Sequence, residues 1–491
     1  MGVPDFASLV LAIVMSMAGG GPNDLLGYIS SSAYWKTKAV EPTVDRMLGE
    51  LTDSTNVRKL IDELSAADPQ ARERAARGIL AAGREAIPQL EAAARDGDAE
   101  MAAQSRALIG QIQLSQKSRS VRRLMAIRTL GELKNRDALA ALQALADSKE
   151  QFVGDYARQA IAAIEGKPAT LPTRPPADRM ADVNLLPQKQ DMVCQLVPTG
   201  GAALPLEKIF DGFPMTVPGD DREAMIQRIN ARVIGGIEAI GNVRLDSITL
   251  GWYTAPLGQP GDAIIIARGE FDMPTIVDFL QRNQVAKKVF SGTDAYLFDE
   301  STALLFPRPG MAVLVAAEAK GEMRVDEVLT AISKGAGTFS ANAELGKLIQ
   351  SIDTQKPFWL VTKVLDLKQI GLFSDTFLGP MDTVTLVAAQ KRSANPPAVT
   401  VQVSATGTDP VEISQALVVA RAELRETANA LAAQAALVPA FKAMSDMAQS
   451  VRIKTEGVKV TADGEVTLGA LVPLVLESGV SLDHGEPDVG K

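Results

Sequence analysis

Residues 68–90 read DPQARERAARGILAAGREAIPQL, and this stretch predicts a helical hairpin. Asp68 is a typical N-cap, and Pro69 suits the first helical position. Gly83 ends the first helix where a left-handed backbone is favoured, and a second apolar stripe begins at Ile87. The first helix presents one apolar face at helical spacing, made of Ala71, Ala75, Ile79 and Leu80.

The pattern of this hairpin recurs between residues 57 and 165. Ile79 and Ile109 occupy matching positions in successive copies, as do Leu90 and Leu142. An internal period is the signature of stacked repeats, because each hairpin alone would expose its apolar stripe. We therefore expect about three stacked hairpins, with many alanines that allow close approach of the helices.

The first hairpin resembles the short HEAT-like repeats of bacterial proteins. The resemblance rests on Asp68, Pro69, Arg72 and Ala75, followed by Gly83 and the Ala86-Ile87-Pro88 step. It extends over residues 57–165, but residues 98–100 lack the proline and residues 136–139 lack the Ile-Pro step. The resemblance implies a right-handed α-solenoid used as a binding scaffold, and hence a protein partner, although a fold alone does not fix a function.

Two segments flank this predicted array. Residues 23–56 predict a short helical lead-in whose Tyr34 and Trp35 pack on the helices that follow. Residues 166–190 contain few large apolar side chains and five prolines: Pro168, Pro172, Pro175, Pro176 and Pro187. That composition predicts an extended linker and the main domain boundary.

Beyond residue 190 strands alternate with amphipathic helices. Strands are predicted at 192–197, 244–253, 263–271, 295–298, 311–316, 358–363, 383–388 and 398–405. Helices are predicted at 222–240, 273–283, 325–334, 342–352, 411–434 and 438–449. Two tight turns, at Glu456-Gly457 and Asp463-Gly464, are expected to close hairpins near the end of the domain.

The C-terminal region has the pattern of an internal duplication. Residues 246–250 match residues 382–386, and an aspartate precedes a helix in both copies, at Asp272 and Asp409. We expect two similar α+β subdomains, 191–355 and 356–480, with mainly antiparallel sheets covered by helices on one side. The predicted fold is therefore multidomain, an all-α HEAT-like solenoid followed by a duplicated α+β domain, with a flexible tail at 481–491.

The composition excludes several kinds of chemistry. The chain of 491 residues contains one histidine, His484, and one cysteine, Cys194. His484 lies in the polar tail, so the sequence argues against histidine-based catalysis and against metal sites with several histidine ligands. Cys194 lies in a predicted strand without a basic neighbour, which favours a buried, unreactive thiol. No catalytic residue, metal or cofactor is predicted.

The N-terminus carries the signal for location. Residues 6–18 form an apolar run that ends in Ser16-Met17-Ala18, typical of a signal peptide over residues 1–18 with cleavage before Gly19. The first five residues carry Asp5 and no basic residue, which is atypical of such a leader. We expect a periplasmic or extracellular protein. A buried N-terminal helix of a cytoplasmic protein and an uncleaved membrane anchor are the alternatives.

A basic cluster is the sharpest charge feature of an otherwise acidic chain. It consists of Lys117, Arg119, Arg122, Arg123 and Arg128. Such a face could attract an acidic partner or anionic lipid, or it could be a solvated helix face. Nucleic acid is not an expected partner, because the net charge is −9 and no aromatic residues interleave with the cluster.

The sequence favours a non-enzymatic interaction or scaffold protein of the bacterial cell envelope, which binds a protein partner through its helical repeats. Membrane association is expected only peripherally or through an uncleaved leader. The alternative is a carboxylate-dependent hydrolase or ligand-binding protein whose site lies between the two α+β subdomains, with Asp246 or Asp382 as the acid.

Overall fold

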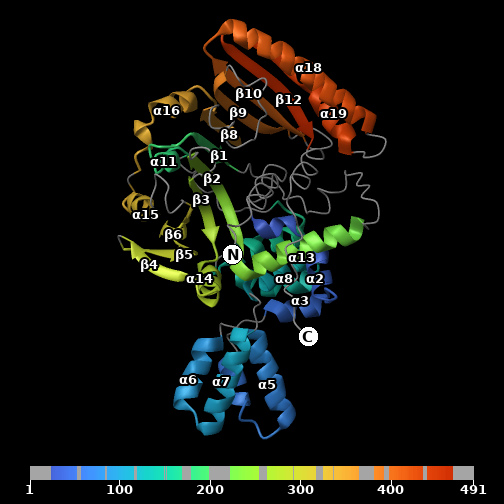
Figure 1. Ribbon diagram of the computed structural model, residues 1–491. Helices are drawn as coiled ribbons and strands as arrows, with labels where there is room; N and C mark the ends of the chain where they lie inside the picture. Colours follow the sequence, from blue (N-terminus) through green and yellow to red (C-terminus); the bar gives the residue numbers. More distant parts are fainter. Residues whose placement is uncertain are drawn as a thin grey trace, which may run out of the picture.

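The computed structural model describes residues 24–51, 57–82, 86–114, 119–148, 150, 152–168, 179–197, 222–253, 262–290, 292–316, 325–335, 337–363, 381–391, 398–434 and 440–467. The predicted signal peptide (1–18), the predicted tail (481–491), His484 and Lys117 lie outside these residues. The described chain is a multidomain α+β structure, with a group of helices and one large antiparallel sheet (Figure 1).

The first core is helical and joins distant parts of the chain. The predicted lead-in forms η1 (Leu25–Tyr28), α2 (Ser31–Thr37) and α3 (Val44–Leu51). Ser30 caps α2 by accepting a hydrogen bond from the amide of Ala33. Tyr34 and Trp35 are fully buried, as expected, in a core shared with α8 (Arg119–Leu133), α9 (Leu139–Ala146), α10 (Val153–Glu165) and α13 (Arg222–Ile240). The short helix η4 (Arg136–Ala138) leads into α9.

A second helical core is separate from the first. Helices α4 (Val57–Glu63), α5 (Pro69–Ala82), α6 (Ile87–Asp96) and α7 (Ala99–Leu114) bury Ile61, Ile79, Leu90 and Ile112 against one another. Figure 1 shows α5, α6 and α7 at one end of the molecule, apart from the sheet. The buried side chains of residues 57–165 thus divide into two cores where we expected one array, because α8–α10 bury their apolar faces against α2, α3 and α13.

The predicted linker is only partly a linker. Residues 169–178 lie outside the described residues, but α11 (Arg179–Val183) and the residues after it pack into the sheet domain. Val183, Leu185 and Leu186 are buried with Trp359 and Val361. The prediction is therefore wrong for residues 179–190, because three closely spaced apolar side chains provide a hydrophobic anchor that the proline content obscured.

The described strands form a single twelve-stranded sheet, in which every pair of neighbouring strands is antiparallel. The strand order is β11-β12-β10-β9-β8-β1-β2-β3-β7-β6-β5-β4. The strands are β1 (Met192–Leu196), β2 (Val243–Tyr253), β3 (Asp262–Phe271), β4 (Ala286–Phe290), β5 (Thr293–Leu297), β6 (Thr302–Arg308), β7 (Met311–Ala316), β8 (Phe358–Lys363), β9 (Met381–Lys391), β10 (Ala398–Gly407), β11 (Arg452–Glu456) and β12 (Lys459–Thr467). The two predicted subdomains share this sheet, since β1 pairs with β8.

Helices cover both faces of the first half of the sheet. Alternate residues of a strand point to opposite faces, so Ile266 and Ala267 of β3 belong to different cores. One face packs against α11, α15 (Val325–Ser333) and α16 (Ala343–Gln350), which follows the short helix η5 (Phe339–Ala341), and the other against α14 (Met273–Arg282). Our expectation of helices on one side is therefore wrong here.

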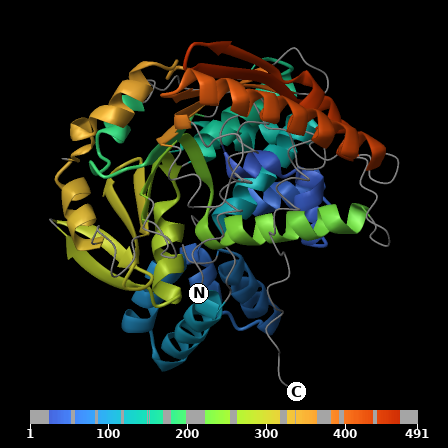
Figure 2. The ribbon, with the colours of Figure 1, turned by 45° about the horizontal axis from the view of Figure 1, so that its top comes forward.

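In the second half of the sheet, α18 (Pro410–Gln434) packs on β9, β10 and β12 through Ile413 and Leu417. Helix α19 (Ala440–Ser450) pairs with α18 (Figure 2). The predicted strands and helices of this domain are confirmed apart from small shifts of their ends, but β4 and β6 were missed. Glu456-Gly457 forms the predicted turn, whereas Asp463-Gly464 lies inside β12 and pairs with Gln402 and Val401 of β10.

Candidate functional site

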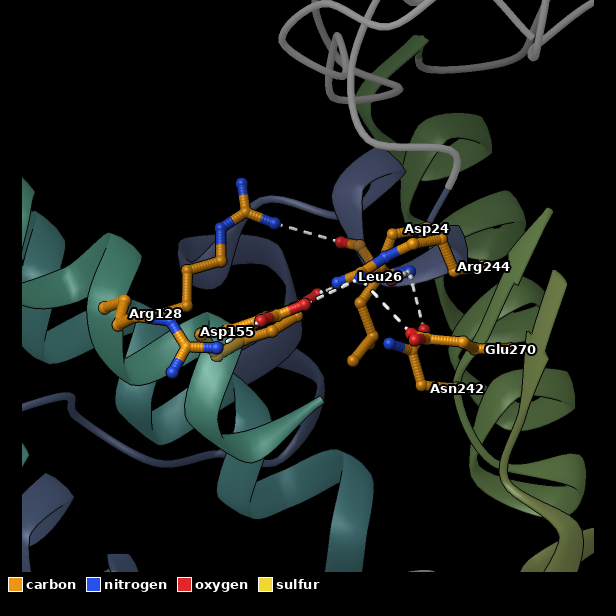
Figure 3. A network of polar contacts seen from close by, with 9 residues as sticks. Asp24, Leu26, Arg128, Asp155, Asn242, Arg244 and Glu270 are labelled. Carbon is orange, nitrogen blue, oxygen red and sulfur yellow. Dashed lines mark hydrogen bonds and ion pairs between the residues drawn. The ribbon is translucent and has the colours of Figure 1, made fainter. Parts of the chain in front are cut away.

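The most highly connected polar cluster of the described residues surrounds Arg244, the second residue of β2 (Figure 3). Its side chain is 8% exposed, and Nη1 donates to Asp155 Oδ2 at 2.8 Å and to Glu270 Oε2 at 3.2 Å. Glu270 is the cross-strand neighbour of Arg244 on β3, whereas Asp155 comes from α10. The guanidinium also lies 5.2 Å from the ring centroid of Phe152. Arg244 therefore ties the sheet to the first helical core.

Asp24 brings a third segment to the same cluster. It caps η1 by accepting from the amide of Leu26 at 3.0 Å, and its other oxygen accepts from the hydroxyl of Tyr156 at 2.8 Å. Its Oδ2 lies 3.9 Å from Arg244 Nη2, and Asp24 and Arg244 also form a backbone bridge. Arg128 of α8 holds the opposite side of η1 by donating to the carbonyls of Leu26 and Ile29.

The two aspartates of this cluster respond to it in opposite ways. Burial raises the pKa of Asp24, against the lowering effect of the Tyr156 hydroxyl and of Arg244. Burial also acts to raise the pKa of Asp155, but hydrogen bonds from Arg244 and Arg158 outweigh it, so that pKa is lowered. Asp155 is thus held as a carboxylate, whereas the ionised form of Asp24 is disfavoured.

A second set of polar contacts lies on α13 and α14. Glu238 of α13 accepts from the hydroxyl of Tyr34 at 2.9 Å and from Lys38 Nζ at 2.6 Å. Asp272, the N-cap of α14, accepts from the hydroxyl of Ser120 at 2.8 Å. The Glu238 contacts join α13 to α2 within the first core, and the Asp272 contact joins α14 of the sheet domain to α8 of that core.

These clusters have the chemistry of a structural clamp. Arg244 and Asp24 are both buried, and each carboxylate of the cluster faces a cation or a hydroxyl within the chain. A buried charge is tolerated when it is paired, and removal of one partner leaves the other uncompensated. The arrangement fixes the position of η1 and α10 on β2 and β3.

The predicted basic face is largely used inside the molecule. Arg122 forms two hydrogen bonds with Glu50 of α3, at 2.6 and 2.7 Å, and lies over Trp35. Arg123 is 4% exposed and pairs with Glu150. Arg128 pairs with Glu132 as well as with η1. Lys117 and the side chain of Arg119 lie outside the described residues. The described arginines therefore stabilise the first core and do not form a free binding surface.

The other predicted residues are separated. Cys194 is buried in β1, as expected, and burial raises its pKa to about 12. Asp246 lies beyond the C-terminal end of β1, and Asp382 lies beyond the C-terminal end of β8. Since β1 and β8 are antiparallel, the two carboxylates lie at opposite ends of this pair, more than about 20 Å apart. The structure does not bring them together as an acid pair.

Two hollows open on the described C-terminal half of the sheet domain. A groove of about 510 Å³ crosses β9, β10, β12 and β11, and its lining includes Lys356, Arg452, Thr400, Gln402 and Asp463. A second, of about 390 Å³, lies between α18, α19 and β11. Within the described ranges no group of three or more His, Cys, Asp or Glu side chains could hold a metal ion, and no helix is long and apolar enough to span a bilayer.

Sequence reasoning missed the Arg244 cluster. A charged residue between Val243 and Leu245 in an apolar strand was an available signal, because a buried charge requires a partner. The sequence does not reveal the partners of Arg244, because Asp155 is 89 residues away and the position of Glu270 opposite Arg244 depends on the register of β2 and β3.

No protein-family model and no curated protein matches the chain. Three crystal forms of TP0453 are similar over 60% of this chain and 95–97% of their own, with 12–13% sequence identity and TM-scores of 0.34–0.35. A TM-score this low does not establish a shared fold.

Proposed function

We propose that this chain is a non-enzymatic scaffold protein of the bacterial cell envelope that captures a protein partner through helices α4–α7. The proposal keeps the HEAT-like resemblance for this unit, where the Asp-Pro capping and the Ile-Pro step are found. Helices α8–α10, in contrast, pack with the first helical core. We call this core and the sheet domain together the body of the molecule, and the Arg244 cluster joins its two parts.

One observation carries the proposal: α4–α7 form a separate helical unit with its own core, which we call the excursion. It is inserted in the chain between α3 and α8, which contact each other. Glu50, at the end of α3, accepts two hydrogen bonds from Arg122, near the start of α8. These bonds join α3 to α8 directly, so the two ends of the excursion are held together by residues outside it. A unit with its own core and a closed base can be devoted to recognition while the body supplies stability.

An internal duplication of the sheet domain is part of the same proposal. Two matched aspartates support it, because Asp246 and Asp382 are both the extra residue of a β-bulge, in β2 against β3 and in β9 against β10. Two matched helix caps also support it: Asp272 accepts from the amide of Thr275, and Asp409 from those of Val411 and Glu412. Bulges are designed features of a sheet, so their match is stronger support than similar apolar strands.

The envelope location rests on the apolar run at residues 6–18 and the small residues after it. Sequencing the N-terminus of the protein purified from its native cell tests it. A mature terminus at Gly19 supports export, whereas an intact leader in a cytoplasmic fraction would contradict it.

The scaffold function is tested by deletion. Residues 52–118 are replaced by a Gly/Ser linker of about eight residues, which spans the short distance between the ends of α3 and α8. Proteins that co-purify with the full chain should be lost from this variant. An unchanged set of co-purifying proteins would show that α4–α7 do not recognise them.

A second candidate, ligand binding by the C-terminal half of the sheet, is favoured by the groove of about 510 Å³. Its lining combines apolar side chains, such as Val387 and Val401, with both signs of charge, from Arg452 and Lys356 and from Asp463 and Glu465. Thermal shift of the full chain against a library of polar small molecules tests it, with Gln402→Ala as the variant that should lose any shift. A shift that survives this substitution would place the ligand elsewhere.

A further inference from the structure

Helix α18 leaves one long face uncovered by the described residues that pack on it. Its inner face buries Ile413 and Leu417 against the sheet and Ala428 farther along. Three large apolar side chains point the other way, where Val411 is 63% exposed, Val418 is 67% exposed and Val419 is 42% exposed. Figures 1 and 2 both show α18 along the outside of the molecule.

Helical geometry places these residues on one stripe. With 3.6 residues per turn, Val411, Gln415, Val418 and Ala422 fall in a line, with Val419 beside them. We call this stripe the outer face of α18. Among the described residues the other exposed large apolar side chains lie outside α18: Leu133, Met180, Val289 and Phe298. The outer face is therefore a local concentration of apolar surface.

The two edges of the outer face carry opposite charge. Arg425 lies along one edge together with Arg421, which also donates to the carbonyl of Ile453 in β11, and Glu412, Glu423 and Glu426 lie along the other. When two copies of such a helix pack side by side in the same direction, the basic edge of each faces the acidic edge of the other. An antiparallel pair would set like charges against each other. The face is thus complementary to itself in the parallel arrangement.

We propose that the outer face of α18 is the docking surface for a second copy of this chain, with the two α18 helices parallel about a two-fold axis. The pair buries Val418 and Val419 at its centre and places Arg425 beside Glu426 of the other copy. This association brings two α4–α7 units into one particle, so the dimer is a bivalent form of the scaffold. The argument rests on α18 alone and is independent of the scaffold proposal.

The size of the face sets the expected strength. A helix of 25 residues is about 38 Å long and about 10 Å wide, which offers roughly 400 Å² to a partner. A stable interface uses about 800 Å² on each side, so the dimer is weak and forms at high protein concentration.

Sedimentation of the full chain between about 10 µM and 1 mM, a range that suits a small interface, tests the proposal. The weight-average mass should rise from one chain towards two. Val418→Glu should weaken association by about tenfold or more, because it buries a charge at the centre of the pair. Val289→Glu is the matched control, since Val289 is 62% exposed but lies on β4. The circular dichroism spectrum and melting temperature of each variant establish that it is folded.

Charge exchange and crosslinking test the arrangement. Arg425→Glu and Glu426→Arg should each weaken the dimer, and the double exchange should restore it, because the opposite signs are then paired again. Asn429→Cys should form a disulfide between copies under oxidation if the helices are parallel. Failure of the disulfide to form in an associated sample would overturn the parallel arrangement.

Three results would overturn the proposal as a whole: a single-chain mass at every concentration, association that Val418→Glu leaves unchanged, or loss of association with Val289→Glu to the same degree. Flotation with vesicles of phosphatidylglycerol and phosphatidylethanolamine tests whether the outer face binds a lipid surface instead of a second copy. If the chain stays monomeric but binds these vesicles through Val418, the outer face docks on a lipid surface, and the second copy is excluded.

Discussion

Arg244 Nη1 on β2 lies 2.8 Å from Asp155 Oδ2 on α10, although 89 residues separate the two positions. Arg244→Met keeps much of the side-chain volume and leaves Asp155, Glu270 and Asp24 without their shared cation. We expect a loss of about 3 kcal/mol in the free energy of unfolding, measured in urea. Arg308→Met, at an exposed arginine of β6, should change it by less than about 0.5 kcal/mol. Equal losses in the free energy of unfolding from the two substitutions would contradict a special stabilising role for Arg244.

The two aspartates of the cluster predict opposite dependences on pH. Asp155 has a lowered pKa, so its stabilising contribution is present above the unfolded value of 3.8 and is lost as the pH falls towards the folded pKa. Asp24 has a raised pKa, so its contribution is present below 3.8 and is lost as the pH rises through the folded pKa. Unfolding measured across the acidic range should show that Asp155→Asn removes a rise in stability with pH and that Asp24→Asn removes a fall. The same sign of change in both variants would contradict the pKa directions.

Close helix packing in the first core depends on Gly131. A Cβ atom at this position would lie 2.7 Å from Cα of Ala160, so α8 and α10 must separate to accept Gly131→Ala. Overpacking of this kind costs about 1–3 kcal/mol. Gly110→Ala, on α7 with nothing within 4 Å of the added atom, should instead gain about 0.5–1 kcal/mol. Thermal unfolding of both variants measures the difference, and a stabilising Gly131→Ala would show that the approach is looser than the structure has it.

Deletion of the excursion, α4–α7, should leave the body folded. In the variant that replaces residues 52–118 with a Gly/Ser linker, the first core and the Glu50–Arg122 bonds are retained. Hydrogen exchange of α2, α8 and the central strands should match that of the full chain. Faster exchange throughout α8 would mean that α4–α7 support the body.

Cys194 offers a probe of the sheet. It lies on β1, between β2 and β8, and burial raises the pKa of its thiol to about 12. The thiol of the folded protein should therefore react with an aromatic disulfide at pH 8 only as fast as the sheet opens. Addition of urea should accelerate the reaction along the unfolding transition. Rapid reaction of the whole sample in native buffer would contradict the burial.

The regular elements could be predicted from the sequence because their signals are local. The helix at 222–240 has the predicted bounds, and the Asp-Pro caps at 68–69 and 409–410 mark the starts of α5 and α18. Strand β4 was missed because four of its five residues are exposed, so it has no apolar alternation. The Asp463-Gly464 turn failed because pairing with β10 stabilises an extended strand more than the local turn preference does.

The candidate site could not be predicted, because its contacts join residues far apart in the chain. A run of basic residues at 117–128 indicated a surface face, but the exposure of an arginine depends on which carboxylates fold against it. Glu50, Glu150 and Glu132 provide those partners for Arg122, Arg123 and Arg128. Likewise, the match between residues 246–250 and 382–386 indicated related strands but not that these strands flank the central β1–β8 pair on opposite sides.

Site-specific photocrosslinking in the native cell tests the central claim most directly. A photoreactive residue is placed at exposed positions of the excursion, Gln70, Arg95 and Ala107, and at exposed positions of the body, Val289 and Lys454. Capture of the same protein partner from at least one position of α5–α7 and from neither body position is the predicted result. Capture from Val289 or Lys454 alone would contradict the assignment of α4–α7 as the recognition unit.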